Sequence, residues 1–136
     1  MIVATNSSTR VRLLAAALVA VVAGVHFQQY VDFMSEVPTV GVLFLLNAAG
    51  GAGLALALVS SDRTLQTLAA LGAIGLCVGS LVSIAIALEG NFLGYSEPSL
   101  RLPIVIAIVA EVAALPVLAM IARGAIKDPL GRSAAA

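Results

Sequence analysis

The residues of this chain that are best able to do chemistry gather in one stretch, VVAGVHFQQYVDFMSEVP at positions 21–38. His26 is the only histidine, and Gln29 and Tyr30 follow it by three and four residues. In a helix this spacing places all three side chains on one face. An imidazole can donate, accept or exchange a proton near neutral pH. The stretch is therefore a candidate site for a proton or a ligand.

A second rare group is a carboxyl group within an apolar run. Glu111 lies in IVIAIVAEVAALPVL, inside the apolar segment 102–122. A charge at the centre of a membrane helix costs at least about 2.5–3.5 kcal/mol, so such a residue is informative. At a rise of about 1.5 Å per residue, Glu111 lies roughly 13 Å below the outer end of its helix. His26, Asn47 and Ser80 lie roughly 10–12 Å below the outer ends of theirs. We therefore expect these four side chains to form one polar layer.

The polar layer allows three interpretations. His26 and Glu111 could share a proton or form a charge pair, with the other two members completing the hydrogen bonds. Such layers also serve simply as hydrogen-bonded connections between helices, each bond contributing less than about 2 kcal/mol. The third interpretation is contact with a partner subunit. Gln29 and Tyr30, further out on the face of His26, are candidates for contact at the outer surface.

The sequence gives no sign of an enzyme, and we expect no catalytic residues. One histidine cannot supply both axial ligands of a membrane b-type haem. Cys77 is the single cysteine, so an internal disulfide or a multi-cysteine metal site is excluded. The seven basic residues balance the seven acidic ones, and no basic run indicates a nucleic-acid partner. We therefore expect no metal, no cofactor and no nucleic acid.

The composition indicates which elements must position these side chains. Of the 136 residues, 61% are hydrophobic and 10% are charged, whereas soluble domains carry about 25% charged residues. A helix needs about 20 apolar residues to span a bilayer. Four segments qualify, at 11–33, 39–59, 65–88 and 102–122. Their short links predict antiparallel neighbours, and hence an all-α membrane protein with an up-down-up-down bundle of four transmembrane helices.

The basic residues predict the orientation, since they stay on the cytoplasmic side. Six of the seven flank one side of the predicted bundle: Arg10, Arg12, Arg63, Arg123, Lys127 and Arg132. The other side has only Arg101, together with four acidic residues. We therefore expect a multi-pass protein of the plasma (inner) membrane with both termini in the cytoplasm. Residues 10–124 would form the transmembrane domain, 1–9 a disordered N-terminus and 125–136 a cytoplasmic tail.

Small residues spaced four apart predict where helices approach closely. Gly75, Gly79 and Ser83 form such a stripe in the third segment. We expect this stripe to pack against another helix of the bundle or, alternatively, against a second copy of the chain. Asp62 is expected to cap the start of the third helix. All six aromatic residues lie in the outer half or the outer links, so recognition is expected in the outer third.

Residues 26–51, HFQQYVDFMSEVPTVGVLFLLNAAGG, resemble small four-helix integral membrane proteins of high-GC Gram-positive bacteria. These proteins show a His, an aromatic residue four positions on, and then Pro-x-x-Gly-x-Leu-Phe-Leu-x-Asn. Here the pattern falls on His26, Tyr30, Pro38, Gly41, Leu43, Phe44, Leu45 and Asn47. The resemblance covers about a fifth of the chain. It implies a four-helix bacterial membrane protein and names no activity.

Three functions remain open from the sequence. The first is a non-catalytic accessory or interaction subunit of a membrane complex. The second is a proton-coupled small transporter or channel that uses Glu111 and His26. The third is a quinone- or lipid-binding redox subunit that uses His26 and Tyr30. The expected partners are the lipid bilayer and either a membrane-protein subunit or a second copy of the chain.

Overall fold

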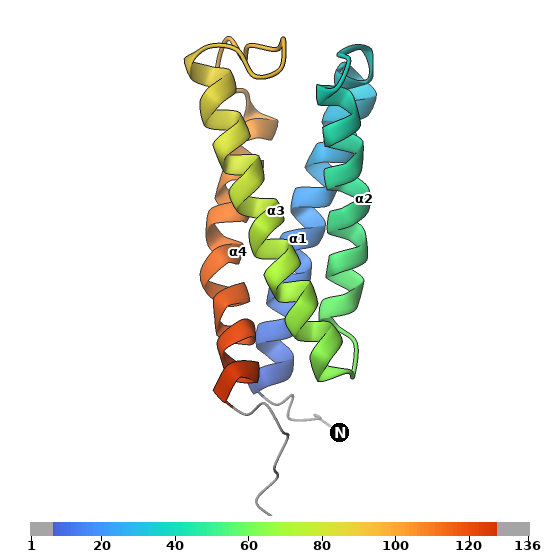
Figure 1. Ribbon diagram of the computed structural model, residues 1–136, viewed down its shortest axis with the longest axis vertical. Coiled ribbons are helices and arrows are strands. Elements are labelled where there is room, and N and C mark those ends of the chain that lie inside the picture. The colour runs from blue at the N-terminus through green and yellow to red at the C-terminus, as the bar shows by residue number, and fades with distance from the viewer. Residues whose placement is uncertain (1–6, 128–136) are drawn as a thin grey trace, which may run out of the picture.

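The computed structural model describes residues 7–127, and this part of the chain is almost entirely helical (Figure 1). The elements are α1 (Ser7–Asp32), the short 3-10 helix η1 (Met34–Glu36), α2 (Val40–Leu58), α3 (Arg63–Glu89) and α4 (Leu102–Lys127). All four α-helices are long and apolar enough to cross a membrane. The all-helical class and the four candidate spans predicted from the sequence are therefore confirmed.

The helices extend beyond the apolar runs that predicted them. α1 begins at Ser7, so residues 7–9, expected to be disordered, are helical, while 1–6 lie outside the described residues. α4 continues past the expected end at residue 122 to Lys127, and the tail from 128 onward lies outside the described residues. An apolar run fixes the part of a helix that fits the hydrocarbon, whereas backbone hydrogen bonds continue into the polar flanks.

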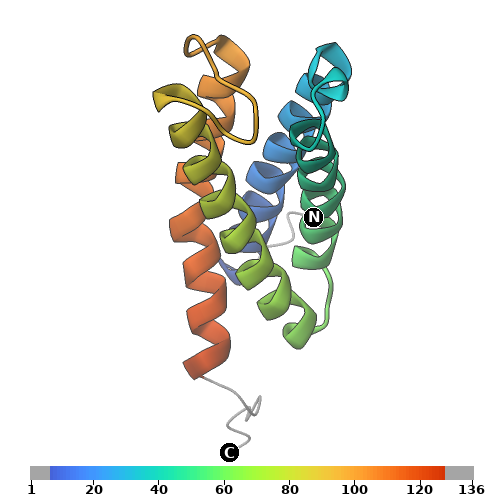
Figure 2. The ribbon, with the colours of Figure 1, turned by 45° about the horizontal axis from the view of Figure 1, so that its top comes forward.

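The four helices stand side by side as a bundle (Figures 1 and 2). α1 packs against α2 and α4, and α3 packs against α4 and α2. The α2–α3 link lies at the same end of the bundle as the start of α1 and the end of α4, and we name this the proximal end (Figure 1). The α1–α2 and α3–α4 links lie at the opposite, distal end. The α2–α3 contact is the least extensive of the four, and these two helices diverge toward the distal end.

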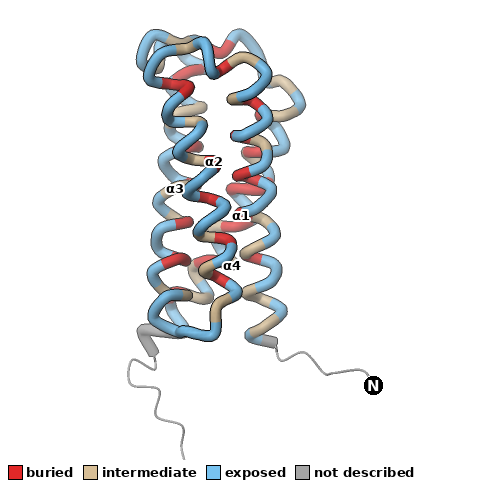
Figure 3. The backbone as a smooth tube through the Cα atoms, turned by 90° about the vertical axis from the view of Figure 1, so that its right-hand side faces the viewer, coloured by how far each residue is buried: buried red, intermediate tan, exposed pale blue. Residues whose placement is uncertain are grey.

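The core of the bundle is built mainly from alanine, with larger side chains at a few positions. Its members include Ala15, Ala70, Ala73, Ala114, Leu58 and Leu118. The buried positions face inward along all four helices (Figure 3). Outward-facing leucines are highly exposed, with Leu56 at 73% and Leu46 at 62%. An apolar exterior around a small-residue interior is the arrangement of a helix bundle whose solvent is lipid.

The glycines of α2 and α3 differ in how closely another helix approaches them. At Gly51 of α2, a Cβ atom would come within 3.0 Å of the Ala23 Cβ, so α1 and α2 approach closely there. At Gly75 and Gly79 of α3, a Cβ atom would meet nothing within 4 Å. Within one chain, therefore, this part of the expected packing stripe does not contact another helix. Ser83, the third member, donates a hydrogen bond to the Gly79 carbonyl oxygen at 2.8 Å.

Candidate functional site

The distal half of the described bundle contains a group of buried polar side chains in apolar surroundings. The buried polar and charged residues are His26, Gln29, Ser80, Glu97 and Glu111. Three of the four members of the predicted polar layer are among them. Asn47, the fourth, is half-buried on α2. Tyr30, one of the two outer candidates, is half-buried on α1.

His26 is held from both sides of its ring. The Nδ1 atom lies 2.9 Å from the Val22 carbonyl oxygen, one turn earlier in α1. A carbonyl oxygen only accepts, so Nδ1 carries a proton and donates it to this bond. The Nε2 atom lies 3.2 Å from the Ser80 hydroxyl on α3. In the neutral ring Nε2 accepts from Ser80, which connects α1 to α3 across the centre of the bundle.

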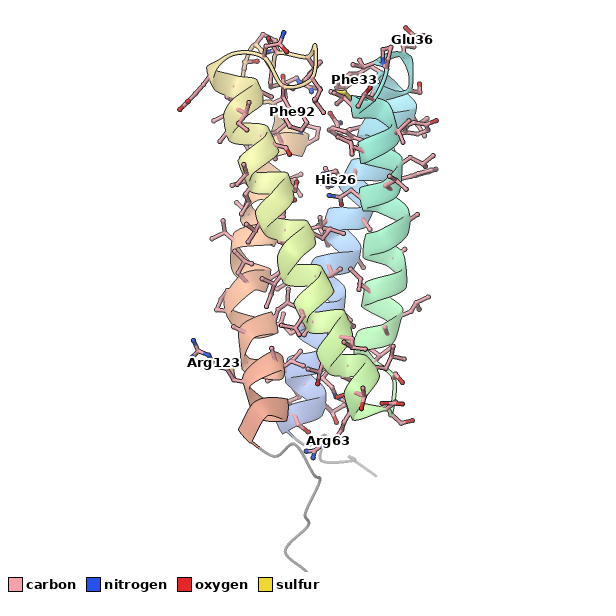
Figure 4. The ribbon with its side chains drawn as sticks, viewed as in Figure 1. His26, Phe33, Glu36, Arg63, Phe92 and Arg123 are labelled. Atoms are coloured by element: carbon pink, nitrogen blue, oxygen red, sulfur yellow. The ribbon has the colours of Figure 1, made fainter. Side chains whose placement is uncertain are left out.

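His26 also contacts an aromatic side chain of α2. The ring of Phe44 lies 5.1 Å from the imidazole, measured between centroids, at a tilt of 42°. In Figure 4, His26 points from α1 into the region between α2 and α3. Hydrogen bonds and ring packing therefore fix the direction of the imidazole.

Glu111 is completely buried on α4, and neither of its carboxyl oxygens has a hydrogen-bond partner among the described residues. The direct His26–Glu111 pair considered from the sequence is therefore not formed. The Ser80 hydroxyl lies close enough to interact with the Glu111 carboxyl group, and it also bonds His26. Ser80 is thus the described side chain that approaches both His26 and Glu111.

Two amide side chains of the distal half also lack partners. Neither Gln29 Oε1 nor Asn47 Oδ1 has a hydrogen-bond partner, and both atoms are buried. Gln29 is only 3% exposed. A buried acceptor without a partner costs about 1–3 kcal/mol, and in a native structure it calls for an explanation.

A cavity of about 420 Å³ explains where these side chains point. His26, Gln29, Asn47 and Ser80 all line it, together with the aromatic rings of Phe44, Phe92 and Tyr95. Gly75, Gly79 and Ser83 line it as well, so the small residues of α3 leave room for a cavity within the chain. Glu111 and Tyr30 are not among the lining residues. A volume of this size is typical of small-molecule sites, which are mostly apolar with a few converging polar groups.

The α3–α4 link folds over the distal end of the cavity, and we name residues 90–101 the cap. Phe92 and Tyr95 exchange two backbone hydrogen bonds, of 2.7 and 2.9 Å, around a tight turn. The turn residues Leu93 and Gly94 have φ of 51° and 89°, as a two-residue hairpin turn requires. The Glu97 backbone N–H donates to the Ala87 carbonyl oxygen at 2.8 Å, which joins the cap to α3.

An ion pair anchors the cap above the cavity. Arg101 donates two hydrogen bonds to the Glu97 carboxylate, at 3.0 and 2.9 Å, and the Tyr95 hydroxyl donates a third at 2.6 Å. The Arg101 guanidinium also lies 4.3 Å from the centre of the Phe33 ring, which follows α1. This cation–π contact joins the cap to the opposite helix pair. Glu97, Arg101 and Tyr95 all line the cavity.

The pKa values of the cap residues follow from these contacts. Burial alone would raise the pKa of Glu97, but hydrogen bonds from Arg101 and Tyr95 outweigh it and lower the pKa below its ordinary value. The hydrogen bond with Glu97 raises the pKa of Arg101. Burial, followed by the bond to Glu97, raises the pKa of Tyr95 to about 12. At neutral pH the cap therefore holds an ion pair and a neutral phenol.

Sequence reasoning missed the cap as part of the site. It treated Glu97 and Arg101 only as charges of an outer link. The available signal was an acid and a base close together in one link, because opposite charges so near in sequence can pair. The concentration of aromatic residues at the outer end was the second signal, since Phe92 and Tyr95 line the cavity.

The side chains that line the site are groups suited to binding. Within residues 7–127, no three His, Cys, Asp or Glu side chains are grouped as metal ligands would be. The lining combines apolar walls with hydroxyl, amide and imidazole groups, which suits an amphipathic molecule. Comparison with protein-family models, curated proteins and solved structures finds no match to this chain. The function must therefore be argued from the site itself.

Proposed function

We propose that this chain is a non-catalytic membrane protein that binds an amphipathic, lipid-soluble molecule in its distal cavity. One observation carries the proposal: the cavity of about 420 Å³ collects the scarce polar side chains of an apolar bundle. Two of the lining groups, Gln29 Oε1 and Asn47 Oδ1, are buried acceptors without a partner. A bound molecule with a polar head would satisfy them. This proposal develops the lipid- or quinone-binding alternative and assigns the chain no redox step.

The proposal includes an orientation in the membrane. The bundle crosses the plasma (inner) membrane of a bacterium four times, up-down-up-down, with both termini in the cytoplasm. Support comes from the charges, since Arg63 and Arg123 lie at the proximal end and Glu36 at the distal end (Figure 4). Basic residues remain on the cytoplasmic side. The cavity then lies in the outer half of the bilayer.

Native mass spectrometry of the full chain, released from mild detergent, tests the binding function. We expect a retained small molecule of defined mass on the wild-type protein, identified afterwards in a solvent extract. The Asn47→Leu variant is expected to lose it, whereas Thr67→Val, a polar-to-apolar change on exposed α3 surface, is expected to keep it. A wild-type protein that retains no lipid-soluble molecule would contradict the proposal. The same spectra report copy number and any partner subunit, which tests the accessory-subunit interpretation.

A second candidate function is proton-coupled transport, and Glu111 is the observation that favours it. The carboxyl group is fully buried without a hydrogen-bond partner and is close to Ser80, which lines the cavity. Intramembrane carboxyl groups of this kind often serve proton relays. Uptake of the retained molecule into liposomes, driven by a proton gradient, would support this function. Glu111→Gln should abolish uptake, while Glu89→Gln, at the exposed end of α3, should not.

A further inference from the structure

The distal cavity is least enclosed between α2 and α3. Leu43 and Leu46 line it from α2, although they are 40% and 62% exposed. Gly75 and Gly79 line it from α3 and are also exposed. No atom lies within 4 Å of a Cβ placed at either glycine. This side is therefore open toward the surface that faces hydrocarbon in the proposed orientation.

The distal end of the cavity is closed by comparison. Phe92 and Tyr95 of the cap line it, and the paired Glu97 and Arg101 lie beside them. The contact of Arg101 with Phe33 joins the cap to the end of α1 across the cavity. A molecule that comes from water would have to displace this ion pair. A molecule that comes from the bilayer meets mainly apolar side chains and glycine backbone, together with the Ser83 hydroxyl, which already donates to the Gly79 carbonyl oxygen.

The unpartnered atoms of the cavity define what the head of such a molecule must offer. Gln29 Oε1 and Asn47 Oδ1 are both hydrogen-bond acceptors. The nearby imidazole is already occupied, since its two nitrogens bond Val22 and Ser80. A ligand that satisfies these two oxygens must therefore supply a donor. A hydroxyl group fits best, because it donates to an amide oxygen and can accept from an amide N–H at the same time.

We propose that a lipid-soluble molecule carrying a free hydroxyl group enters sideways between α2 and α3, and that its hydroxyl donates to Gln29 and Asn47. The inference rests on the proposed binding function and adds the ligand class and the route. Two sources share this chemistry: a long-chain hydroquinone, and a glycerolipid with a free hydroxyl such as diacylglycerol. The experiment distinguishes them.

Four probes test the ligand class on the purified full chain in mild detergent. They are a long-chain hydroquinone kept reduced without oxygen, diacylglycerol, and the analogue of each in which hydrogen replaces hydroxyl. Binding is titrated by native mass spectrometry. We expect one hydroxyl probe to bind roughly tenfold more tightly than its deoxy analogue, the value of one buried hydrogen bond. The probe that shows this preference identifies the source.

Variants connect this preference to the two amides. Gln29→Leu and Asn47→Leu should each reduce the preference for the hydroxyl probe, while Thr67→Val should preserve it. Equal affinity of hydroxyl and deoxy probes for the wild-type protein would overturn the ligand class and leave the binding function standing. The comparison of hydroxyl and deoxy probes uses only the wild-type protein. It therefore tests the ligand class even if Gln29→Leu or Asn47→Leu prevents folding. Failure of every probe, with no retained molecule, would overturn the proposed function itself.

The route is tested by filling the open side of the cavity. Gly79→Leu places a large side chain on the cavity wall, where no atom stands within 4 Å of its Cβ. We expect loss of probe binding. Gly53→Leu is the matched control, because Gly53 is also helical with nothing within 4 Å but does not line the cavity. It should bind as the wild type does. Unchanged binding by Gly79→Leu would overturn access between α2 and α3.

Discussion

Tyr95, Glu97 and Arg101 form one hydrogen-bonded group of side chains. Two bonds from Arg101 and one from Tyr95 converge on a single carboxylate that is 7% exposed. The carboxylate is thereby the centre of the cap. Its ionisation decides whether the cap remains joined to Arg101 and, through the guanidinium, to Phe33.

The stability of the protein should therefore depend on pH through this group. The pKa of Glu97 is lowered from 4.5 in the folded state. Its contribution is present above pH 4.5 and is lost as the pH falls through the lower folded value. The pKa of Tyr95 is raised from 10.0 to about 12, so its contribution is lost as the pH rises between those values. Thermal unfolding across pH should show both losses.

Substitutions separate the two losses. Glu97→Gln should flatten the acid side, and Tyr95→Phe the alkaline side. Glu36→Gln, an exposed acid at the same end, should leave both sides as in the wild type. An acid profile of Glu97→Gln that matches the wild type would show that the cap does not control stability.

Ser80 should control the energetic coupling between His26 and Glu111. A double-mutant cycle of His26→Leu with Ser80→Ala should give a coupling of about 0.6 kcal/mol and at most about 1.7, as for other interhelical bonds in membranes. His26→Leu and Glu111→Gln should couple only while Ser80 is present. Unfolding free energies in detergent provide the measurement. Coupling of His26 and Glu111 that persists in Ser80→Ala would indicate a direct contact.

At the scale of elements, the helical glycines are of two kinds. At some positions a neighbouring element leaves no room for a Cβ atom, and at others the space is open. Gly41, in the first turn of α2, lies against η1, and a Cβ there would overlap the carbonyl oxygen of Met34. Gly53, further along the same helix, has open space around it. The two positions therefore provide opposite tests of one substitution.

Gly41→Ala should destabilise the protein by about 1–3 kcal/mol, since backbone must move to relieve the overlap. Gly53→Ala should stabilise it by about 0.5–1 kcal/mol through helix propensity alone. Both are measured by unfolding in the same detergent. Equal effects at the two positions would show that η1 does not pack on α2 in this way.

The elements were predictable where their causes are local. Apolar runs predicted the four helices, and Asp62 caps α3 as expected, with its carboxylate accepting from Thr64 and Leu65 at 2.8 and 3.0 Å. The burial of His26, Ser80 and Glu111 was predictable from their places within apolar runs. The hydrogen-bond partner of His26 was not predictable, because Ser80 rather than Glu111 bonds it. Which helix faces His26 depends on the order of the helices around the bundle, and spacing along the chain does not give that order. The position of Gly79 on the cavity wall was not predictable either. The spacing of small residues does not show whether they contact another helix or face open space.

At the scale of the whole molecule, the two halves of the bundle differ. The proximal half has an alanine-rich core, and the distal half has the cavity with polar lining, the aromatic rings and the cap. The same asymmetry appears in the charges. The proposed ligand would therefore lie in the half of the bundle where α2 and α3 diverge and make few contacts with each other.

This asymmetry predicts how the molecule sits in a membrane. Single cysteines are introduced into a Cys77→Ser background at Glu36 and Glu89 for the distal end, and at Ser61 and Arg123 for the proximal end. With both termini in the cytoplasm, an impermeant thiol reagent should label only the distal pair in intact cells, because reagent does not cross the bilayer. Permeabilised cells should label all four. Labelling of the proximal pair alone would show the opposite orientation, with both termini outside the cell. Labelling of one position from each pair would contradict a chain that crosses the membrane four times.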